Sequence, residues 1–246
     1  MNIVKTLVIA TGLFLLSSQV QAVVIDFKGL ADGSIGESAW NTLMFTVDGD
    51  HTELASDAFL DITGTNGQDS YAYLDSGNAG LGVCGTLYDP LKANTAFPHS
   101  NANLCNPSSD DNVTYHISDP ETLHFVFDAA VIIEKIWLNN NHDGDRSLLN
   151  DYVAMGIDGA TNPTQLTNGG YMLDSWLNPN LIVGAGQSFD VGFSLFQGDN
   201  QSCYPYDYND CEFYVSKIEF STVPEPGALA LLGLGLIGLG AIRFRH

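Results

Sequence analysis

The chain has 246 residues, and its 29 aspartates and glutamates against 8 lysines and arginines give a formal net charge of −21 at pH 7. Such a charge repels the phosphates of DNA, RNA and anionic lipid headgroups, so the composition excludes nucleic acid and acidic membrane surfaces as direct partners. It favours divalent cations, basic surfaces or simple solubility.

The amino-terminal segment, residues 1–22, has the pattern of a secretory signal peptide. Lys5 supplies a positive charge, Leu7 to Leu16 are mostly apolar, and Val20-Gln21-Ala22 offers small residues for cleavage. The apolar stretch is short for a membrane span, which argues against a retained anchor. We therefore expect export through the Sec machinery and a mature chain that begins at Val23.

Alternation of apolar and polar residues dominates the middle segment, residues 23–221, where turn-rich clusters separate the alternating runs. The runs are Leu43/Phe45/Val47, Leu123/Phe125/Phe127, Val153/Met155/Ile157, Gln187 to Phe196 and Phe213 to Phe220. Val131 to Leu138 is apolar enough to be a strand buried on both faces. No helical period is sustained and no internal repeat occurs. The pattern predicts one all-β domain, a jelly-roll-like two-sheet antiparallel β-sandwich of about eight to ten strands.

The alternation lapses between Asp75 and Pro120, and so long an irregular stretch is expected to be functional or tied down. An even number of cysteines in an exported chain indicates disulfides, and four occur here, so three connectivities are possible. We choose Cys84–Cys105 and Cys203–Cys211, because each pair encloses loop-like sequence. Zinc is less favoured, since no C-x-x-C spacing appears and no histidine lies near a cysteine pair.

A candidate cation site follows the apolar strand. Asn139, Asn141, Asp143 and Asp145 place oxygen ligands at alternate positions around Gly144, which resembles the first half of an EF-hand calcium loop. Asn150 replaces the closing glutamate and a strand leads into the loop. The alternative is an Asx-rich turn, so calcium binding is a hypothesis.

The ring closed by Cys203 and Cys211 contains Tyr204, Tyr206 and Tyr208. Rigid aromatic side chains with a polar tip suit stacking on sugar rings or protein surfaces. The alternative is that they fold back onto the edge of the sandwich. The chain's three tryptophans are further candidate platforms: Trp40, Trp137 and Trp176. Trp137 lies in the most apolar strand and is expected in the core.

Sequence patterns for catalysis are missing. The chain contains no G-x-S-x-G elbow, no H-E-x-x-H and no phosphate-binding glycine loop. Its histidines are scattered, and His124 alternates outward on its strand. We therefore expect no enzymatic activity.

The carboxyl-terminal segment, residues 222–246, has three parts. Pro224, Glu225 and Pro226 precede an apolar run, Ala228 to Ile242, and Arg243 and Arg245 lie near the chain end. As a helix this run rises about 22 Å, short of a hydrocarbon core of roughly 30 Å, and snorkelling arginines close part of the difference. The pattern predicts a transmembrane helix with its arginines in the cytoplasm. The alternative is a helix buried in a soluble core.

This tail resembles the PEP-CTERM sorting signal of exported proteins of Gram-negative bacteria. In that family an integral-membrane protease, an exosortase, recognises the tail and processes the protein. The resemblance implies transient insertion in the inner membrane and a final place at the cell surface or in the extracellular polysaccharide matrix. The tail is sometimes labelled an ice-binding protein C-terminal domain, but ice binding calls for a regular threonine array, and Thr63 and Thr65 stand almost alone.

A second likeness covers roughly residues 78–145. The segments Gly80 to Cys84 and Cys105 to Val113, with the strand that ends at Asp128, are similar to one group of PEP-CTERM sandwich proteins. This likeness implies a fold and names no activity. Together these observations predict an exported, non-catalytic structural or adhesive β-sandwich. A carbohydrate-binding module is the first alternative, and a secreted hydrolase is the second.

Overall fold

A computed structural model describes residues 21–66, 70–96, 103–106, 111–114, 121–139, 152–165, 175–193 and 212–224. The chain divides into two compact units, and the unit Ala22–Val223 contains every element described below. Among the residues described, no helix is long and apolar enough to cross a membrane. The predicted signal peptide up to Val20 and the predicted tail helix lie outside the described residues.

The elements in chain order are β1 (Ala22–Asp26), α1 (Phe27–Ala31), β2 (Ser38–Trp40), β3 (Leu43–Phe45), β4 (His51–Thr52), the 3-10 helix η1 (Ala55–Asp57), β5 (Leu60–Thr65), β6 (Tyr71–Asp75), β7 (Gly80–Cys84), the 3-10 helix η2 (Pro90–Lys92), β8 (Val113–Thr114), β9 (Thr122–Phe127), β10 (Val131–Asn139), β11 (Tyr152–Ile157), β12 (Ala160–Gln165), β13 (Ser175–Leu177), β14 (Leu181–Val183), β15 (Ser188–Phe193) and β16 (Glu212–Thr222).

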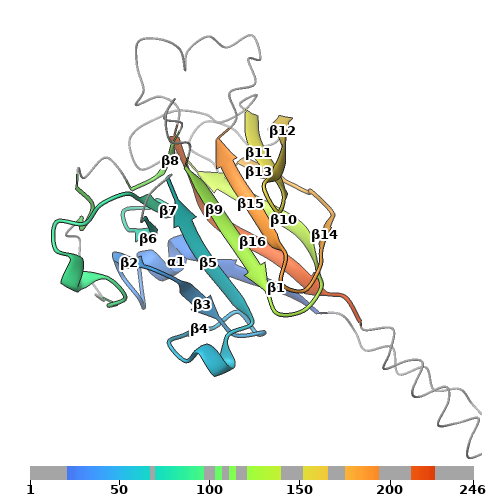
Figure 1. The fold of residues 1–246 in the computed structure, drawn as a ribbon, viewed down its shortest axis with the longest axis horizontal. Helices are drawn as coiled ribbons and strands as arrows, with labels where there is room; N and C mark the ends of the chain where they lie inside the picture. The colour runs from blue at the N-terminus through green and yellow to red at the C-terminus, as the bar shows by residue number, and fades with distance from the viewer. Residues whose placement is uncertain are drawn as a thin grey trace, which may run out of the picture. The chain divides into compact units, whose positions relative to one another are not determined.

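Within the described residues these strands form two antiparallel sheets (Figure 1). The nine-stranded sheet has the order β13-β10-β16-β7-β6-β2, with β1 and β8 also paired to β16 and β14 paired to β10. The seven-stranded sheet has the order β12-β11-β15-β9-β5-β3-β4. The predicted all-β sandwich is confirmed. It has more strands than expected, because strands of two or three residues are too short to show an alternation.

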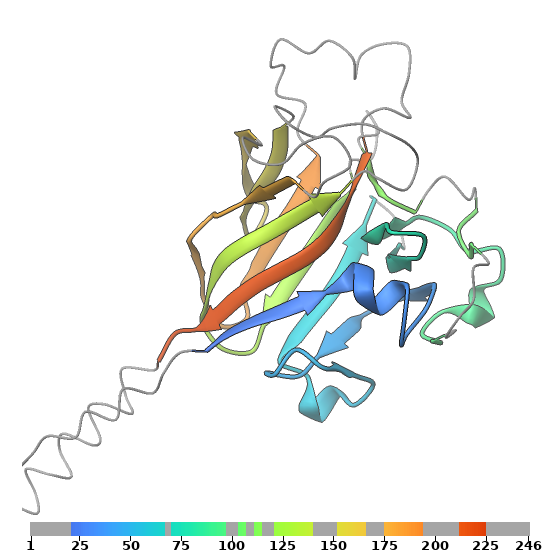
Figure 2. The same ribbon diagram turned by 180° about the vertical axis from the view of Figure 1, so that it is seen from behind.

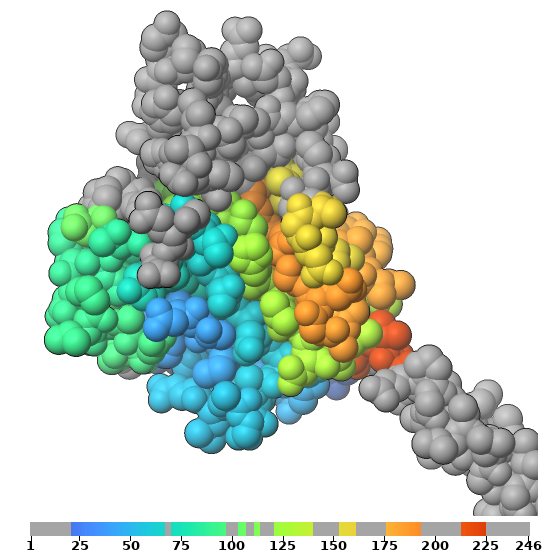
Figure 3. Space-filling view, viewed as in Figure 1, coloured from blue at the N-terminus to red at the C-terminus, as the bar shows by residue number. Residues whose placement is uncertain are grey.

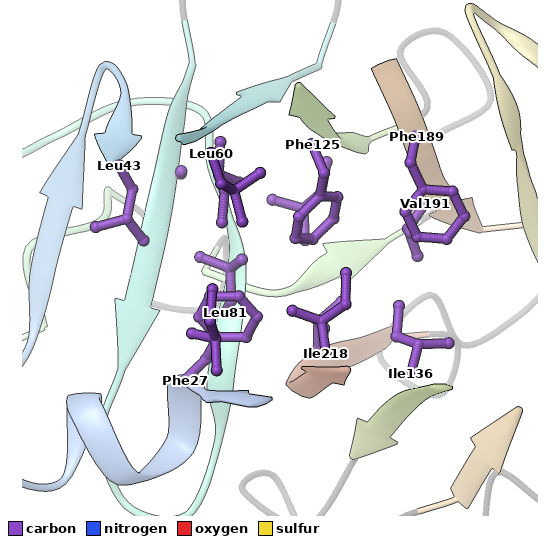
Figure 4. Close-up of a cluster of buried hydrophobic side chains, with 14 of the residues drawn as sticks. Phe27, Leu43, Leu60, Leu81, Phe125, Ile136, Phe189, Val191 and Ile218 are labelled. Atoms are coloured by element: carbon purple, nitrogen blue, oxygen red, sulfur yellow. The ribbon is translucent and has the colours of Figure 1, made fainter. Parts of the chain in front are cut away.

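The core lies between the two sheets, where alternate side chains of each sheet face the other. Phe125 and Phe189 of the seven-stranded sheet lie opposite Ile136 and Ile218 of the nine-stranded sheet, and all four are fully buried (Figure 4). The alternating apolar runs of the sequence supply these side chains. Burial of each aromatic or branched aliphatic side chain contributes roughly 1.5–3 kcal/mol.

Helix α1 was not predicted, because five residues are too few to show a helical period. The Asp26 side chain accepts a hydrogen bond from the Gly29 N–H at 2.9 Å and caps its first turn. Phe27 is fully buried and packs edge-on against Phe45, with ring centroids 5.8 Å apart. The helix therefore carries an aromatic side chain into the end of the sandwich core.

Three expectations about individual strands were wrong. Val47 is 46% exposed because β3 ends at Phe45, and the chain turns before Val47 reaches the core. The stretch from Asp75 to Pro120 is not irregular throughout, since Gly80–Cys84 forms β7 inside the nine-stranded sheet. Its two glycines weaken the alternating pattern, so the strand was missed.

The third error concerns β10, which is not buried on both faces. Its residues alternate between buried and partly exposed, and the register with β16 shifts between Ile133 and Lys135. This irregularity is a β-bulge at Glu134. It lets Ile133 and Ile136 both enter the core, while Lys135 and Trp137 share the outer face.

The first and last strands of the domain lie side by side. In Figure 2 the blue strand β1 and the red strand β16 run next to each other and reach the same corner of the sheet. Their register pairs Ala22 with Ser221. The predicted signal-peptide cleavage point and the start of the predicted sorting segment are therefore neighbours in the fold.

Candidate functional site

A disulfide-tied segment covers part of the outer face of the nine-stranded sheet. We call this segment, Gly85–Asn112, the cap; it is described over residues 85–96, 103–106 and 111–112. Cys84 of β7 is bonded to Cys105 of the cap, with their Cα atoms 5.8 Å apart. This is the pairing chosen from the sequence. In Figure 3 the described part of the cap lies within the green surface, beside the cyan surface.

The cap encloses a second, smaller apolar core. Its fully or almost fully buried members are Ala39, Tyr73, Cys84, Leu87 and Cys105. The cap lies so close to the sheet at Gly82 that a Cβ there would overlap the backbone of Asp111. Glycine is required at this position because the cap crosses β7 directly.

Buried tyrosines hold the cap to the sheet. The Tyr73 hydroxyl donates to Glu37 Oε1 at 2.7 Å and accepts from the Leu104 N–H at 2.8 Å. The Tyr214 hydroxyl donates to Asp111 Oδ1 at 2.9 Å. Burial, with Glu37 as the next cause, raises the pKa of Tyr73, so its hydroxyl stays protonated and keeps donating.

A polar network crosses the outer face of the seven-stranded sheet. His124 Nδ1 lies 2.6 Å from Asp190 Oδ1, and His124 Nε2 lies 2.9 Å from the Thr65 hydroxyl. The Asp190 carboxylate also accepts from the Ser188 hydroxyl at 2.6 Å and from the Gly159 N–H at 2.5 Å. The side chain of His124 is 28% exposed, as its outward alternation predicted, whereas that of Asp190 is almost fully buried.

A hydroxyl, an imidazole and a carboxylate in this order are also the groups that nucleophilic hydrolases use. Here the Asp190 carboxylate accepts from Gly159 in the turn between β11 and β12. The His124 imidazole on β9 bonds side chains of the two neighbouring strands, β15 and β5. These contacts join the strands and the turn of one sheet. We therefore interpret the network as a cross-strand support.

Asp190 is expected to make stability depend on pH at the acid end. Burial opposes its ionisation, but hydrogen bonds from His124, Ser188 and Gly159 outweigh burial and lower its pKa. The stabilisation is therefore complete above the unfolded value of about 3.9 and is lost as pH falls through the lower folded pKa. Asp190→Asn should lower the melting temperature at pH 7, and the difference from wild type should shrink below about pH 4. Melting curves from pH 7 to 2 measure this, with exposed Asp48→Asn as the control. A difference at pH 2 as large as that at pH 7 would contradict it.

Two tryptophans form an aromatic surface on the outer face of the nine-stranded sheet. Trp137 of β10 and Trp176 of β13 are directly paired across the strands. The Lys135 ammonium lies 4.5 Å from the ring centroid of Trp137 and 4.0 Å from that of Trp176. All three side chains are partly exposed. We call them the tryptophan platform.

Two of the three tryptophans lie elsewhere than expected. Trp137 was predicted in the core, and the bulge at Glu134 instead leaves it on the outer face. Trp40, a candidate sugar platform, is only 3% exposed and donates its indole N–H to the Ser38 hydroxyl at 2.9 Å. Within the described part of the chain, Lys135 forms no ion pair, whereas Lys217 pairs with Asp26 at 2.8 Å.

The predicted calcium site is described only at Asn139. Its amide donates to the Ala79 carbonyl oxygen at 2.7 Å and to that of Asn78, and so supports the turn between β6 and β7. Across the described ranges, no group of three or more His, Cys, Asp and Glu residues is placed to hold a metal. Calcium binding stays a prediction.

The remaining predicted site residues, apart from Pro224, lie outside the described residues. They are Asn141, Asp143 and Asp145 of the calcium site, the ring residues Cys203, Tyr204, Tyr206, Tyr208 and Cys211, and Glu225, Pro226, Arg243 and Arg245 of the sorting segment. Pro224 is exposed and directly follows the end of the sheet.

Comparison with known families identifies the carboxyl end of the chain. A family model of the PEP-CTERM protein-sorting motif matches residues 222–245, the segment with the Pro-Glu-Pro triplet, the apolar run and the arginines. Comparisons with curated proteins and with solved structures found no match. The chain therefore carries the PEP-CTERM protein-sorting motif, which marks an exported protein of Gram-negative bacteria that is sorted to the cell surface with an exosortase as its processing partner.

Proposed function

We propose that the exported part, a jelly-roll-like sandwich, is a non-catalytic structural or adhesive protein of the cell surface or the extracellular polysaccharide matrix. The observation that carries this proposal is the sorting motif at residues 222–245. The disulfide-tied cap supports it, because disulfides persist in oxidising compartments outside the cytoplasm. The acidic composition supports it as well, since a strong net charge keeps an exported domain soluble.

Each end of the chain has a separate function in export. The signal peptide directs the chain across the inner membrane, and the apolar tail then holds it there with Arg243 and Arg245 on the cytoplasmic side. The exosortase processes the tail and releases or transfers the sandwich. Calcium at the Asn139 loop would rigidify the domain, and a melting temperature that EGTA does not change would exclude it.

The test compares cells with and without the protein. We expect the mature protein in the surface and matrix fractions, weaker cohesion of the matrix in its absence, and no turnover in a broad screen of glycosidase and esterase substrates. Turnover by the purified mature protein would overturn the non-catalytic assignment. Equal cohesion in both strains would overturn the structural role.

Carbohydrate binding is the second candidate, and the tryptophan platform favours it. Indole faces stack on the apolar faces of sugar rings, and the ammonium of Lys135 donates to sugar hydroxyls. Glu219 lies opposite Lys135 on β16, and the net charge of the chain is strongly negative. A neutral polysaccharide therefore suits this surface better than a uronic acid polymer, which these acids repel.

For carbohydrate binding, Trp176→Ala should weaken the affinity for a neutral polysaccharide by about tenfold or more, as loss of a central aromatic anchor does. Affinity electrophoresis of the mature protein, after selection of the polysaccharide on a glycan array, measures this change. Leu91→Ala is the matched control, because Leu91 is 92% exposed and lies in the cap. Binding that Tyr206→Ala abolishes and Trp176→Ala leaves unchanged would place the sugar site on the Cys203–Cys211 ring instead.

A further inference from the structure

The last strand of the domain runs directly into the sorting motif. The motif match begins at Thr222, which is also the final residue of β16. The next residue, Val223, still donates its N–H to the Ala130 carbonyl oxygen at 2.8 Å. Pro224 follows at once. No spacer therefore separates the hydrogen-bonded backbone of the sheet from the Pro-Glu-Pro triplet.

At this end of β16, Ser221 is held on both sides, whereas Thr222 and Val223 are held on the β10 side. Ser221 is paired with Ala22 of β1 and with Ile132 of β10, and Thr222 is paired with Val131 of β10. A strand with a neighbour on each side has little free backbone to offer to another protein. While the sheet is closed, paired backbone groups of these residues are therefore not free to bond a protease.

Phe220 sets how far the strand can open. Its side chain is fully buried, and its ring centroid lies 5.1 Å from that of Phe127 and 6.0 Å from that of Phe59. Releasing the residues from Ser221 to Val223 breaks backbone hydrogen bonds and exposes the small buried side chain of Ser221, but moves no aromatic ring. Opening beyond them requires an aromatic ring to leave the core, which costs far more.

We propose that the folded sheet gates the sorting motif, because the end of β16 must detach from β1 and β10 before the exosortase can hold the triplet. The inference rests on the proposed processing by an exosortase. Proteases bind several consecutive substrate residues in extended form, and a folded substrate supplies them through local opening. Processing of the folded precursor is then limited by release of Ser221, Thr222 and Val223.

The first test inserts a flexible linker of about six Gly and Ser residues between Val223 and Pro224 of the full-length chain. The half-time of precursor processing in cells that contain the exosortase is followed by pulse-labelling. It should shorten about fivefold for each backbone hydrogen bond that no longer has to open. The control places the same linker after Glu53, an exposed position between β4 and η1. Equal half-times for wild type and the Val223–Pro224 insertion would overturn the gate.

The second test locks the gate. Ile132→Cys with Ser221→Cys places two thiols at directly paired positions of β10 and β16. The oxidised variant should be processed several-fold more slowly than wild type, and a reductant should restore the rate. Processing at the wild-type rate with the new disulfide formed would overturn the proposal. A further variant, with alanine in place of the Pro-Glu-Pro triplet, distinguishes the two proposals. If this variant is processed normally, the proposed function is wrong. If it is not processed and the linker has no effect on the half-time, only the gate is wrong.

Discussion

Replacing Pro224, Glu225 and Pro226 together with alanine is expected to leave the full-length precursor in the inner-membrane fraction. The triplet lies between the end of the sheet and the apolar run, in the segment that the sorting-motif model matches. Two prolines hold the backbone extended and end any helix that extends from the apolar run. Three alanines remove this restriction, because alanine has the highest helix propensity. We expect the predicted apolar helix then to lengthen at its amino-terminal end, so that the exosortase no longer recognises the triplet.

Fractionation followed by immunoblotting measures this result. Wild type should appear as a processed form outside the inner membrane, and the alanine variant almost wholly as unprocessed membrane protein. The matched control replaces Asp89, Pro90 and Leu91 with alanine, since these three residues are exposed and also include an acid and a proline. A processed, released form of the triplet variant at the wild-type level would show that the motif is not what the processing enzyme recognises.

Removing the Cys84–Cys105 disulfide is expected to have the largest effect on stability. The bond closes a sequence separation of 21 residues, for which the loss of unfolded-state entropy contributes about 3 kcal/mol. For a domain of this size, that corresponds to a melting temperature lower by about 10 °C. The second core under the cap depends on the same bond, because both of its cysteines are members of that core.

The variant Cys84→Ser with Cys105→Ser tests this, and differential scanning calorimetry of the mature protein measures it. The double replacement leaves Cys203 and Cys211 intact, so it separates the Cys84–Cys105 bond from the predicted Cys203–Cys211 bond, which a reductant does not. Ser56→Ala is the control, because this serine is exposed and its hydroxyl donates to the neighbouring Asp57. An unchanged melting temperature in the double variant would contradict a stabilising role for the disulfide.

The candidate sites were less predictable than the strands, for a geometrical reason. Thr65 and His124 are 59 residues apart, and His124 and Asp190 are 66 apart. Their meeting depends on the order β15-β9-β5 within one sheet. Alternation correctly placed His124 on an outer face. It contains no information on which strand lies beside which, since strand order depends on packing of the whole domain.

Sorting of this protein for export and the general plan of its fold could both be predicted from sequence. The sorting motif and the alternating strands are local patterns, and hydropathy along a short segment is enough to reveal them. The tertiary structure alone decided that the bulge at Glu134 leaves Trp137 on the outer face beside Trp176 and Lys135. It also decided that Ala22 and Ser221 are paired at one corner of the sheet. Both depend on register between distant strands, which follows from long-range packing and not from the residues of any one segment.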